Sequence, residues 1–248
     1  KRLHDEEQLA VEFKDYPDAE NYIDDFFMGW LIAAGSNDRV KIEKELKEKG
    51  RDPKAFSFKR DSVLRMNMAV ALEPYRYNSV FTQSPLDMSS KENKSHKNSD
   101  SSQLLHRETT YTAFQYPFAL NLSDCAKKPE WTRTFLKAIG ELNNVAGNHA
   151  RSYFEMSPAS IVLRFTNQLV AGYDNYGFKI TGDTHQLPEV VEGILKKDYP
   201  GQEFFLGGKI VKGLNEGQIA DLQKLGVTMD RSPQKLLETI GNKAFPPK

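Results

Sequence analysis

The sequence predicts an α+β fold, because segments with the two-residue period of strands alternate with segments of helical spacing. Residues 62–72 and 112–122 alternate apolar and other side chains, as strands with one face on a core do. Residues 129–145 carry apolar side chains at helical spacing, and 160–166 alternate again. This strand–helix–strand succession is half of a ferredoxin-like, or RRM-like, fold. Residues 62–72 would belong to the other half, whose first strand we expect to be missing from this chain.

The predicted strand at 62–72, SVLRMNMAVAL, has two different faces. Arg65 and Asn67 are expected on a mixed face, where they could meet a ligand. In the strand at 112–122, Pro117 has no N–H to donate to a neighbouring strand, so an edge or a bulge is expected there. The core face of 62–72 is expected to carry Leu64, Met66, Met68, Val70 and Leu72.

Helices are predicted before and after these strands along the chain. Residues 38–49 have the pattern of an exposed helix that stops at Gly50. The helix at 129–145 begins with Pro129, which suits a first turn, and carries the apolar stripe Trp131, Phe135, Ile139 and Leu142. Residues 20–34 are also expected to be helical, with an apolar stripe of Ile23, Phe27, Trp30 and Leu31.

The last part of the chain adds further helices and one strand. A helix is predicted at about 188–198, and a short strand, FFLGGKI, at 204–210. Asn215 and Gln218 have the spacing of a capping box at the start of another helix. Ser232–Pro233 opens the last helix.

We interpret the whole chain, 1–248, as a single RRM-like domain that lacks its N-terminal part. Residues 15–58 are interpreted as a helical insertion, 74–110 as a flexible insertion and 181–248 as a C-terminal α/β extension. Within 74–110, the stretch SSKENKSHKNSDSSQ has almost no apolar side chains and cannot bury enough surface to order itself. A loop this long inside a domain is usually functional or disordered.

The composition is that of an ordinary soluble globular protein, with 39% hydrophobic and 27% charged residues. Basic and acidic residues number 34 each, so the net charge is zero, which argues mildly against a nucleic-acid partner unless the positive charges cluster. No apolar run approaches the roughly 18 residues that span a membrane, so no membrane partner is expected. The single cysteine, Cys125, cannot form an internal disulfide, and a cytoplasmic location is expected.

The sequence contains no recognisable catalytic motif. It has no G-x-S-x-G, P-loop or H-E-x-x-H motif, and no two of its five histidines have metal-ligand spacing on a helix. We therefore expect no enzymatic activity, no metal and no cofactor. Cys125 could serve as a nucleophile, but an incidental, buried cysteine is the preferred interpretation. Gly207–Gly208–Lys209 could approach a phosphate, although a hairpin turn is preferred.

Two clusters of basic side chains are candidates for binding RNA. Arginine binds phosphates in a forked geometry and stacks on bases, and aromatic or histidine rings stack on unpaired bases. The alternative is that these are ordinary solvated charges. The first cluster consists of Lys59, Arg60, Arg65 and Arg76, with Asn67 on the same strand face as Arg65. The second consists of Asn148, His149, Arg151 and Tyr153, and Arg107 belongs to the long insertion.

Four stretches together resemble the Cas-seven backbone subunit of type I CRISPR Cascade complexes, in the DevR subgroup and of an I-B-like type. The most specific is VAGNHARSYFEMSPASIVLRFT at 145–166. The others, in the expected order, are YIDDFFMGWL, DSVLRMNMAVALEPYRY and TTYTAFQYPFALNL. The resemblance covers about 1–180.

This resemblance implies an RRM-like core with a finger- or web-like insertion and a protruding thumb, which we map to 15–58 and 74–110. It implies copies that stack head-to-tail along one guide RNA, while base pairing supplies target specificity. The implied partners are the guide crRNA, target DNA, copies of the chain itself, and the large, small and cap subunits of Cascade. A helicase-nuclease or transposition proteins would act downstream.

Two other functions remain open from the sequence. A guide-RNA-processing endoribonuclease with a related fold would use His149 or His106 as its acid–base group. A protein-only scaffold in a developmental pathway, which the subgroup's historical name suggests, would purify without nucleic acid.

Overall fold

The computed structural model describes residues 16–83, 104–109, 112–143 and 155–247. These residues belong to two compact units. The first unit contains 16–68, 117–143 and 155–247, and the second contains the described residues between 69 and 116. Helices and strands both occur, so the predicted α+β class is confirmed.

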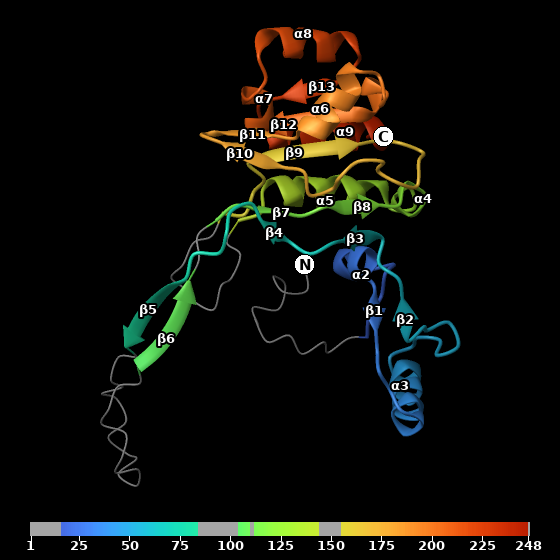
Figure 1. Cartoon of the computed structure of the whole chain (residues 1–248). Helices are drawn as coiled ribbons and strands as arrows, with labels where there is room; N and C mark the ends of the chain where they lie inside the picture. Colours follow the sequence, from blue (N-terminus) through green and yellow to red (C-terminus); the bar gives the residue numbers. More distant parts are fainter. Residues whose placement is uncertain (1–15, 84–103, 110–111, 144–154, 248) are drawn as a thin grey trace. The chain divides into compact units, whose positions relative to one another are not determined.

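The largest sheet of the first unit has three strands in the order β13-β12-β9 (Figure 1). The central strand, β12 (Phe204–Gly208), pairs antiparallel with β9 (Ser160–Arg164) and parallel with β13 (Thr228–Asp230). All five residues of β12 are buried. Because successive side chains of a strand point to opposite faces, Phe204 and Phe205 join different cores.

Helices supply both of these cores. One contains Phe204 and apolar side chains of α6 (Pro188–Leu195), α7 (Lys209–Lys212) and α8 (Glu216–Lys224). The other contains Phe205 and side chains of α5 (Pro129–Gly140) and α9 (Pro233–Ala244). The hairpin of β10 (Lys179–Thr181) and β11 (Thr184–Gln186) and the 3-10 helix η1 (Gly201–Glu203) complete this part of the unit.

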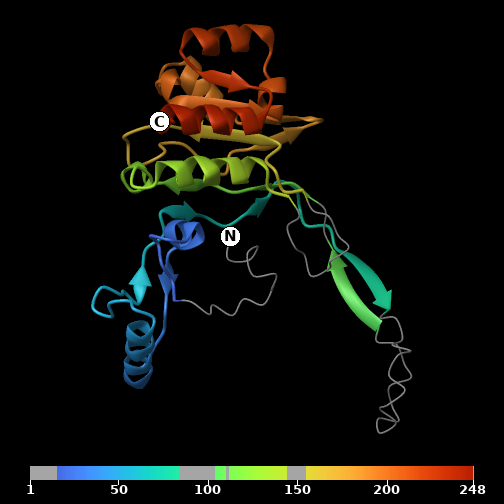
Figure 2. The ribbon, with the colours of Figure 1, turned by 180° about the vertical axis from the view of Figure 1, so that it is seen from behind.

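Helix α5 packs against two cores, and both ribbon views show it between β9 and β8 (Figures 1 and 2). Its Leu136 packs with Phe205, whereas its Phe135 stacks on Phe27 with ring centroids 4.3 Å apart. The core around Phe27 also takes side chains from α2 (Ile23–Met28), β3 (Leu64–Met66), β8 (Phe118–Leu120) and α4 (Leu122–Cys125).

The predicted insertion at 15–58 contains α2, β1 (Trp30–Leu31) and α3 (Ser36–Glu48). β1 pairs antiparallel with β2 (Lys59–Arg60). Within α3 only Leu46 is buried, as expected for an exposed helix, whereas α2 contributes Phe26 and Phe27 to the core.

The prediction of one strand over 62–72 is wrong. The segment forms β3 and a separate two-residue strand, β4 (Val70–Ala71), which pair with β8 and β7 (Phe114–Gln115), respectively. Pro117 separates the two partner strands, as its missing N–H predicted. Of the predicted core face only Leu64 is buried, while Met66, Met68 and Val70 are 54%, 80% and 42% exposed.

Three further predictions need correction and one is confirmed. The predicted helix at 20–34 ends at Met28, because Gly29 leaves helical geometry. The helix predicted to reach 145 ends at Gly140. The glycine pair after Leu206 is not a hairpin turn, since β12 leads directly into α7. The capping box is confirmed, with Asn215 and Gln218 each binding the other's backbone N–H.

The second unit contains a two-stranded antiparallel ribbon of β5 (Asn78–Gln83) and β6 (Leu104–Thr109). The ribbon lies within the predicted flexible insertion at 74–110. The polar stretch at 89–103 lies outside the described residues. The Tyr75 hydroxyl donates a hydrogen bond to the Glu108 carboxylate, which ties the ends of the ribbon together.

Candidate nucleic-acid interface

The candidate site forms in the first unit, where α2 gives way to β1 at Gly29. Gly29 has φ 65° and ψ −168°, a conformation that is essentially restricted to glycine. A Cβ at this position would lie 2.3 Å from the backbone oxygen of Arg60. The chain between β2 and β3 therefore packs directly on the glycine backbone, which brings residues 59–65 next to residues 28–31.

The Arg60 side chain fixes this junction. Its Nη1 donates hydrogen bonds to the carbonyl oxygens of Asp25 and Phe26, at 3.1 and 2.7 Å. Carbonyls in the last turn of a helix have few partners within the helix. The guanidinium therefore adds a hydrogen bond to the Phe26 carbonyl and a second one to the Asp25 carbonyl, which also accepts from the Gly29 N–H at 3.1 Å. The Arg60 guanidinium also lies 5.7 Å from the centroid of the Trp30 ring, in cation–π geometry. The Trp30 indole N–H donates to the Ser57 carbonyl at 2.8 Å, so this ring is held from two sides.

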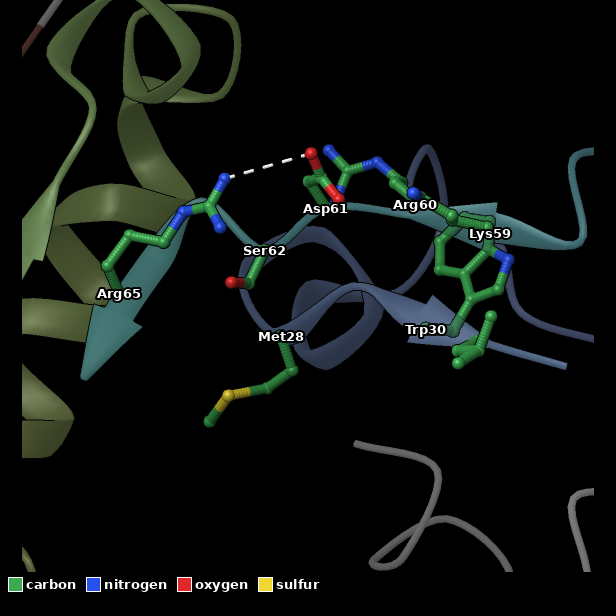
Figure 3. A pocket seen from close by; sticks show the side chains of 8 residues that line it. Met28, Trp30, Lys59, Arg60, Asp61, Ser62 and Arg65 are labelled. Carbon is green, nitrogen blue, oxygen red and sulfur yellow. Dashed lines mark ion pairs between the residues drawn. The ribbon is translucent and has the colours of Figure 1, made fainter. Parts of the chain in front are cut away.

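The resulting basic hollow has a volume of about 420 Å³ (Figure 3). Two of its side chains, Met28 and Leu31, are 57% and 76% exposed, so apolar surface lies beside the cations. Three cations and one carboxylate line it, which gives a net charge of +2. The lining residues are Met28, Trp30, Leu31, Lys59, Arg60, Asp61, Ser62 and Arg65.

The cationic side chains of the hollow differ in how strongly other groups of the protein hold them. Arg65 faces Asp61 at 3.9 Å, and both side chains are well exposed to solvent (Figure 3). An exposed ion pair of this length is weak, so a phosphate can replace Asp61 as the partner of Arg65 at little cost. Lys59 is exposed on β2, whereas Arg60 is held by the α2 carbonyls. Lys59 and Arg65 are therefore better placed than Arg60 to meet an anion.

This combination of side chains suits a nucleotide chain. Lysine and arginine neutralise phosphates, and an aromatic or aliphatic surface next to them can receive the face of a base. The eight lining residues include no histidine or cysteine that could act as an acid–base group or nucleophile.

The structure brings together three of the predicted RNA-binding residues, Lys59, Arg60 and Arg65. Asn67 is exposed one residue beyond β3 but does not line the hollow. Arg76 is exposed in the second unit, and Arg107 lies in β6 of that unit. The second predicted cluster, Asn148, His149, Arg151 and Tyr153, lies outside the described residues, so those contacts stay predictions.

Sequence reasoning missed the apolar part of the hollow. Trp30 and Leu31 were expected in the core stripe of a helix over 20–34, yet they form a short strand at the edge of the hollow. The available signal was Gly29, since glycine often follows the end of a helix. With the helix ended there, the helical spacing that assigned Trp30 and Leu31 to the core no longer applies.

Other candidate groups are less suited to chemistry. Cys125 is fully buried, as the preferred interpretation predicted, and burial raises the pKa of its thiol. His185 is partly buried, and burial together with Lys209 lowers its pKa. Within the part of the chain that the structure describes, no group of three or more histidine, cysteine or acidic side chains could hold a metal ion. In the same residues, no helix has the length and apolar character needed to cross a membrane.

Comparison with known proteins identifies a relative. The chain is 30% identical over 198 residues to a protein of Myxococcus xanthus (strain DK1622) that is described as CRISPR-associated protein Cas7/Cst2/DevR. The chain is a homologue of this Cas7/Cst2/DevR protein. This homology supports the resemblance to Cas7 proteins of the DevR group that was seen in the sequence.

The chain spans less than two thirds of the length of this relative. The aligned residues make up 79% of the chain but 60% of the length of the Cas7/Cst2/DevR protein. No family model matches the chain.

Proposed function

We propose that this protein binds guide RNA as a backbone subunit of a type I, I-B-like, Cascade surveillance complex. Copies would assemble head-to-tail along the RNA and present it for pairing with target DNA. The observation that carries the proposal is the basic hollow of the first unit, with exposed cations beside exposed apolar side chains. The homology to a Cas7/Cst2/DevR protein supports the CRISPR context.

In this role the chain binds the RNA through charge, holds it in place through shape, and catalyses no reaction. Lys59 and Arg65 neutralise guide phosphates, which releases counterions and makes binding weaker as salt rises. Trp30 and the aliphatic side chains beside it contact bases or sugars. Arg60 keeps the hollow in shape through its contacts with α2. Arg76, Arg107 and the 148–153 segment would add contacts elsewhere along the guide.

The proposed architecture is an RRM-like core in which β3, β8, α5 and β9 take part, with the second unit as the thumb. The proposed partners are the guide, target DNA, other copies, and the large, small and cap subunits. A helicase-nuclease or transposition proteins would act afterwards, in the cytoplasm. The neutral net charge suits such an assembly, because strongly basic copies would repel each other.

Substitution of the two exposed cations tests the proposal. We expect Lys59→Ala and Arg65→Ala each to weaken binding of single-stranded RNA whatever its sequence, since phosphate contacts carry no sequence information. Each substitution should also make the negative slope of log K against log salt shallower by about 0.7, the value for one phosphate contact on a single strand. Fluorescence anisotropy over a salt series measures both quantities.

Lys224→Ala is the matched control, because Lys224 is an exposed cation that pairs with Asp221 on α8, far along the chain from the hollow. It should leave the slope unchanged. Wild-type affinity and slope in both hollow variants would show that the hollow does not bind RNA. Purification with partner subunits gives an independent test, since discrete RNA with CRISPR repeat sequence should accompany the protein.

A further inference from the structure

Among the eight residues that line the basic hollow, one is acidic, Asp61. Its carboxylate faces the Arg65 guanidinium at 3.9 Å (Figure 3). That distance is longer than a hydrogen bond, and the two side chains are 72% and 65% exposed, respectively. An exposed ion pair of this length contributes little to stability. The fold therefore does not require a carboxylate at this position.

The main chain that carries Asp61 is held in place on both sides. The preceding residue, Arg60, is bonded to the carbonyl oxygens of α2, and the following Val63 and Leu64 are buried. Gly29 packs directly on this segment, since a Cβ there would lie 2.8 Å from the Asp61 carbonyl carbon. A carboxylate on a fixed main chain loses less entropy when it binds a ligand.

This carboxylate restricts which ligand the hollow can accept. A negative charge beside Lys59 and Arg65 opposes the binding of phosphates, because like charges repel. An ionised carboxylate can only accept hydrogen bonds. A phosphate that replaces Asp61 as the partner of Arg65 leaves the carboxylate without its cation. The carboxylate is then satisfied only if the ligand also brings a hydrogen-bond donor.

RNA and DNA differ in the donor that their backbones offer. The phosphate, ester and ring oxygens of both strands are acceptors, so the sugar–phosphate backbone of DNA has no donor. RNA adds a 2′-hydroxyl to each sugar, and this group donates as well as accepts. It stands on the carbon next to the one that carries the 3′ phosphate. A ribonucleotide thus presents an anion and a donor side by side, which matches the neighbouring cation and acceptor of Arg65 and Asp61.

We propose that Asp61 makes the hollow select RNA over DNA, by accepting a hydrogen bond from a ribose 2′-hydroxyl while Arg65 binds the neighbouring phosphate. The inference rests on the proposed function and names the feature of the strand that the hollow recognises. Base amino groups are the other donors of a nucleotide, but a contact with them would favour particular bases. A guide of any sequence has a 2′-hydroxyl at every position, so the sugar is the donor that suits every guide.

Asp61→Ala distinguishes a hydroxyl contact from a merely repulsive charge. Full-length protein is titrated into a labelled single strand of about 12 nucleotides, made of A and C only, as RNA and as DNA, and fluorescence anisotropy gives both affinities. We expect the wild type to bind RNA at least about fivefold more tightly, the factor for one solvent-accessible hydrogen bond. The variant should bind DNA more tightly than the wild type does, because a repulsive charge is gone. RNA gains the same amount but loses the hydrogen bond, so the ratio of the two affinities should fall by about fivefold.

Glu48→Ala is the matched control. Glu48 pairs with Lys44 on α3, also at 3.9 Å and four residues apart, and its side chain is 64% exposed. The substitution removes an equally exposed carboxylate that does not line the hollow. It should leave the ratio of RNA to DNA affinity unchanged.

A change in the ligand tests the same contact from the other side. A 2′-fluoro strand keeps the sugar conformation of RNA but has no proton to donate at this position. The wild type should bind it about fivefold less tightly than RNA, and in Asp61→Ala this difference should disappear. Crossing the two protein forms with the two ligands isolates the one hydrogen bond from the shape of the strand.

The outcomes separate this inference from the proposed function. An unchanged ratio of RNA to DNA affinity in Asp61→Ala would refute the hydroxyl contact and leave guide binding intact. Equal wild-type affinity for RNA and for its 2′-fluoro form, or for RNA and DNA, would refute it in the same way. If the wild-type protein bound neither strand, the proposed function would fail, and the inference would fail with it.

Discussion

Gly29→Ala should destabilise the first unit more than a substitution of a glycine that has positive φ but open space around it. The backbone of Gly29 lies at φ 65° and ψ −168°, where a side chain costs about 1–3 kcal/mol. The added Cβ would also lie 2.3 Å from the Arg60 oxygen and 2.8 Å from two further backbone atoms of Asp61 and Ser62. Backbone atoms cannot rotate aside, so the whole 60–62 segment must move.

That movement would break the two hydrogen bonds from Arg60 to the end of α2. At about 1 kcal/mol for each bond, the total loss of unfolding free energy is about 4 kcal/mol. Gly50→Ala is the matched control: Gly50 has φ 72°, but a Cβ there would meet nothing within 4 Å. The control should lose only the unfolding free energy that corresponds to a side chain at positive φ, about 1–2 kcal/mol.

Urea unfolding followed by tryptophan fluorescence measures both variants, because Trp30 and Trp131 lie in or beside the affected core. The difference between the two losses reports the displacement of the 60–62 segment together with the hydrogen bonds that it breaks. Equal losses in Gly29→Ala and Gly50→Ala would refute the argument that the Arg60 segment packs rigidly on the glycine. Since the clash displaces Lys59 and Arg65, the Gly29 variant should also bind RNA less well.

Three further predictions concern the remaining part of the first unit. Arg164→Ala should lower the unfolding free energy by about 3 kcal/mol, because it leaves the Glu203 carboxylate without its partner; a loss below about 1 kcal/mol would argue against a buried pair. Asn215→Ala should cost about 1 kcal/mol in urea unfolding by removing the capping box with Gln218, and an unchanged midpoint would contradict the cap. Cys125 should react with a thiol reagent much more slowly in the native protein than in urea, because burial both shields the thiol and raises its pKa; equal rates would contradict its burial.

Local patterns in the sequence determined the element types and part of the site. Period-two alternation identified the strands around Leu64, Leu120 and Ile161, and the cap at Asn215 is set by residues three positions apart. Lys59, Arg60 and Arg65 could be grouped because they are close along the chain. The same closeness made the family resemblance visible in short stretches, and the homology to a Cas7/Cst2/DevR protein supports that resemblance.

Only the tertiary structure decided which strand faces are buried and which cationic side chains are held by other protein groups. Alternation shows that two faces of a strand differ, but whether Met66 and Met68 are covered depends on elements far away in the chain. Likewise, Arg60 and Lys59 look equivalent in the sequence, yet Arg60 is held by carbonyls 34 and 35 residues away. The same holds for Arg164, whose side chain is only 5% exposed because Glu203 and the loop after β9 fold around it. Burial and hydrogen bonding are set by long-range contacts, so they follow from the folded chain and not from its local pattern.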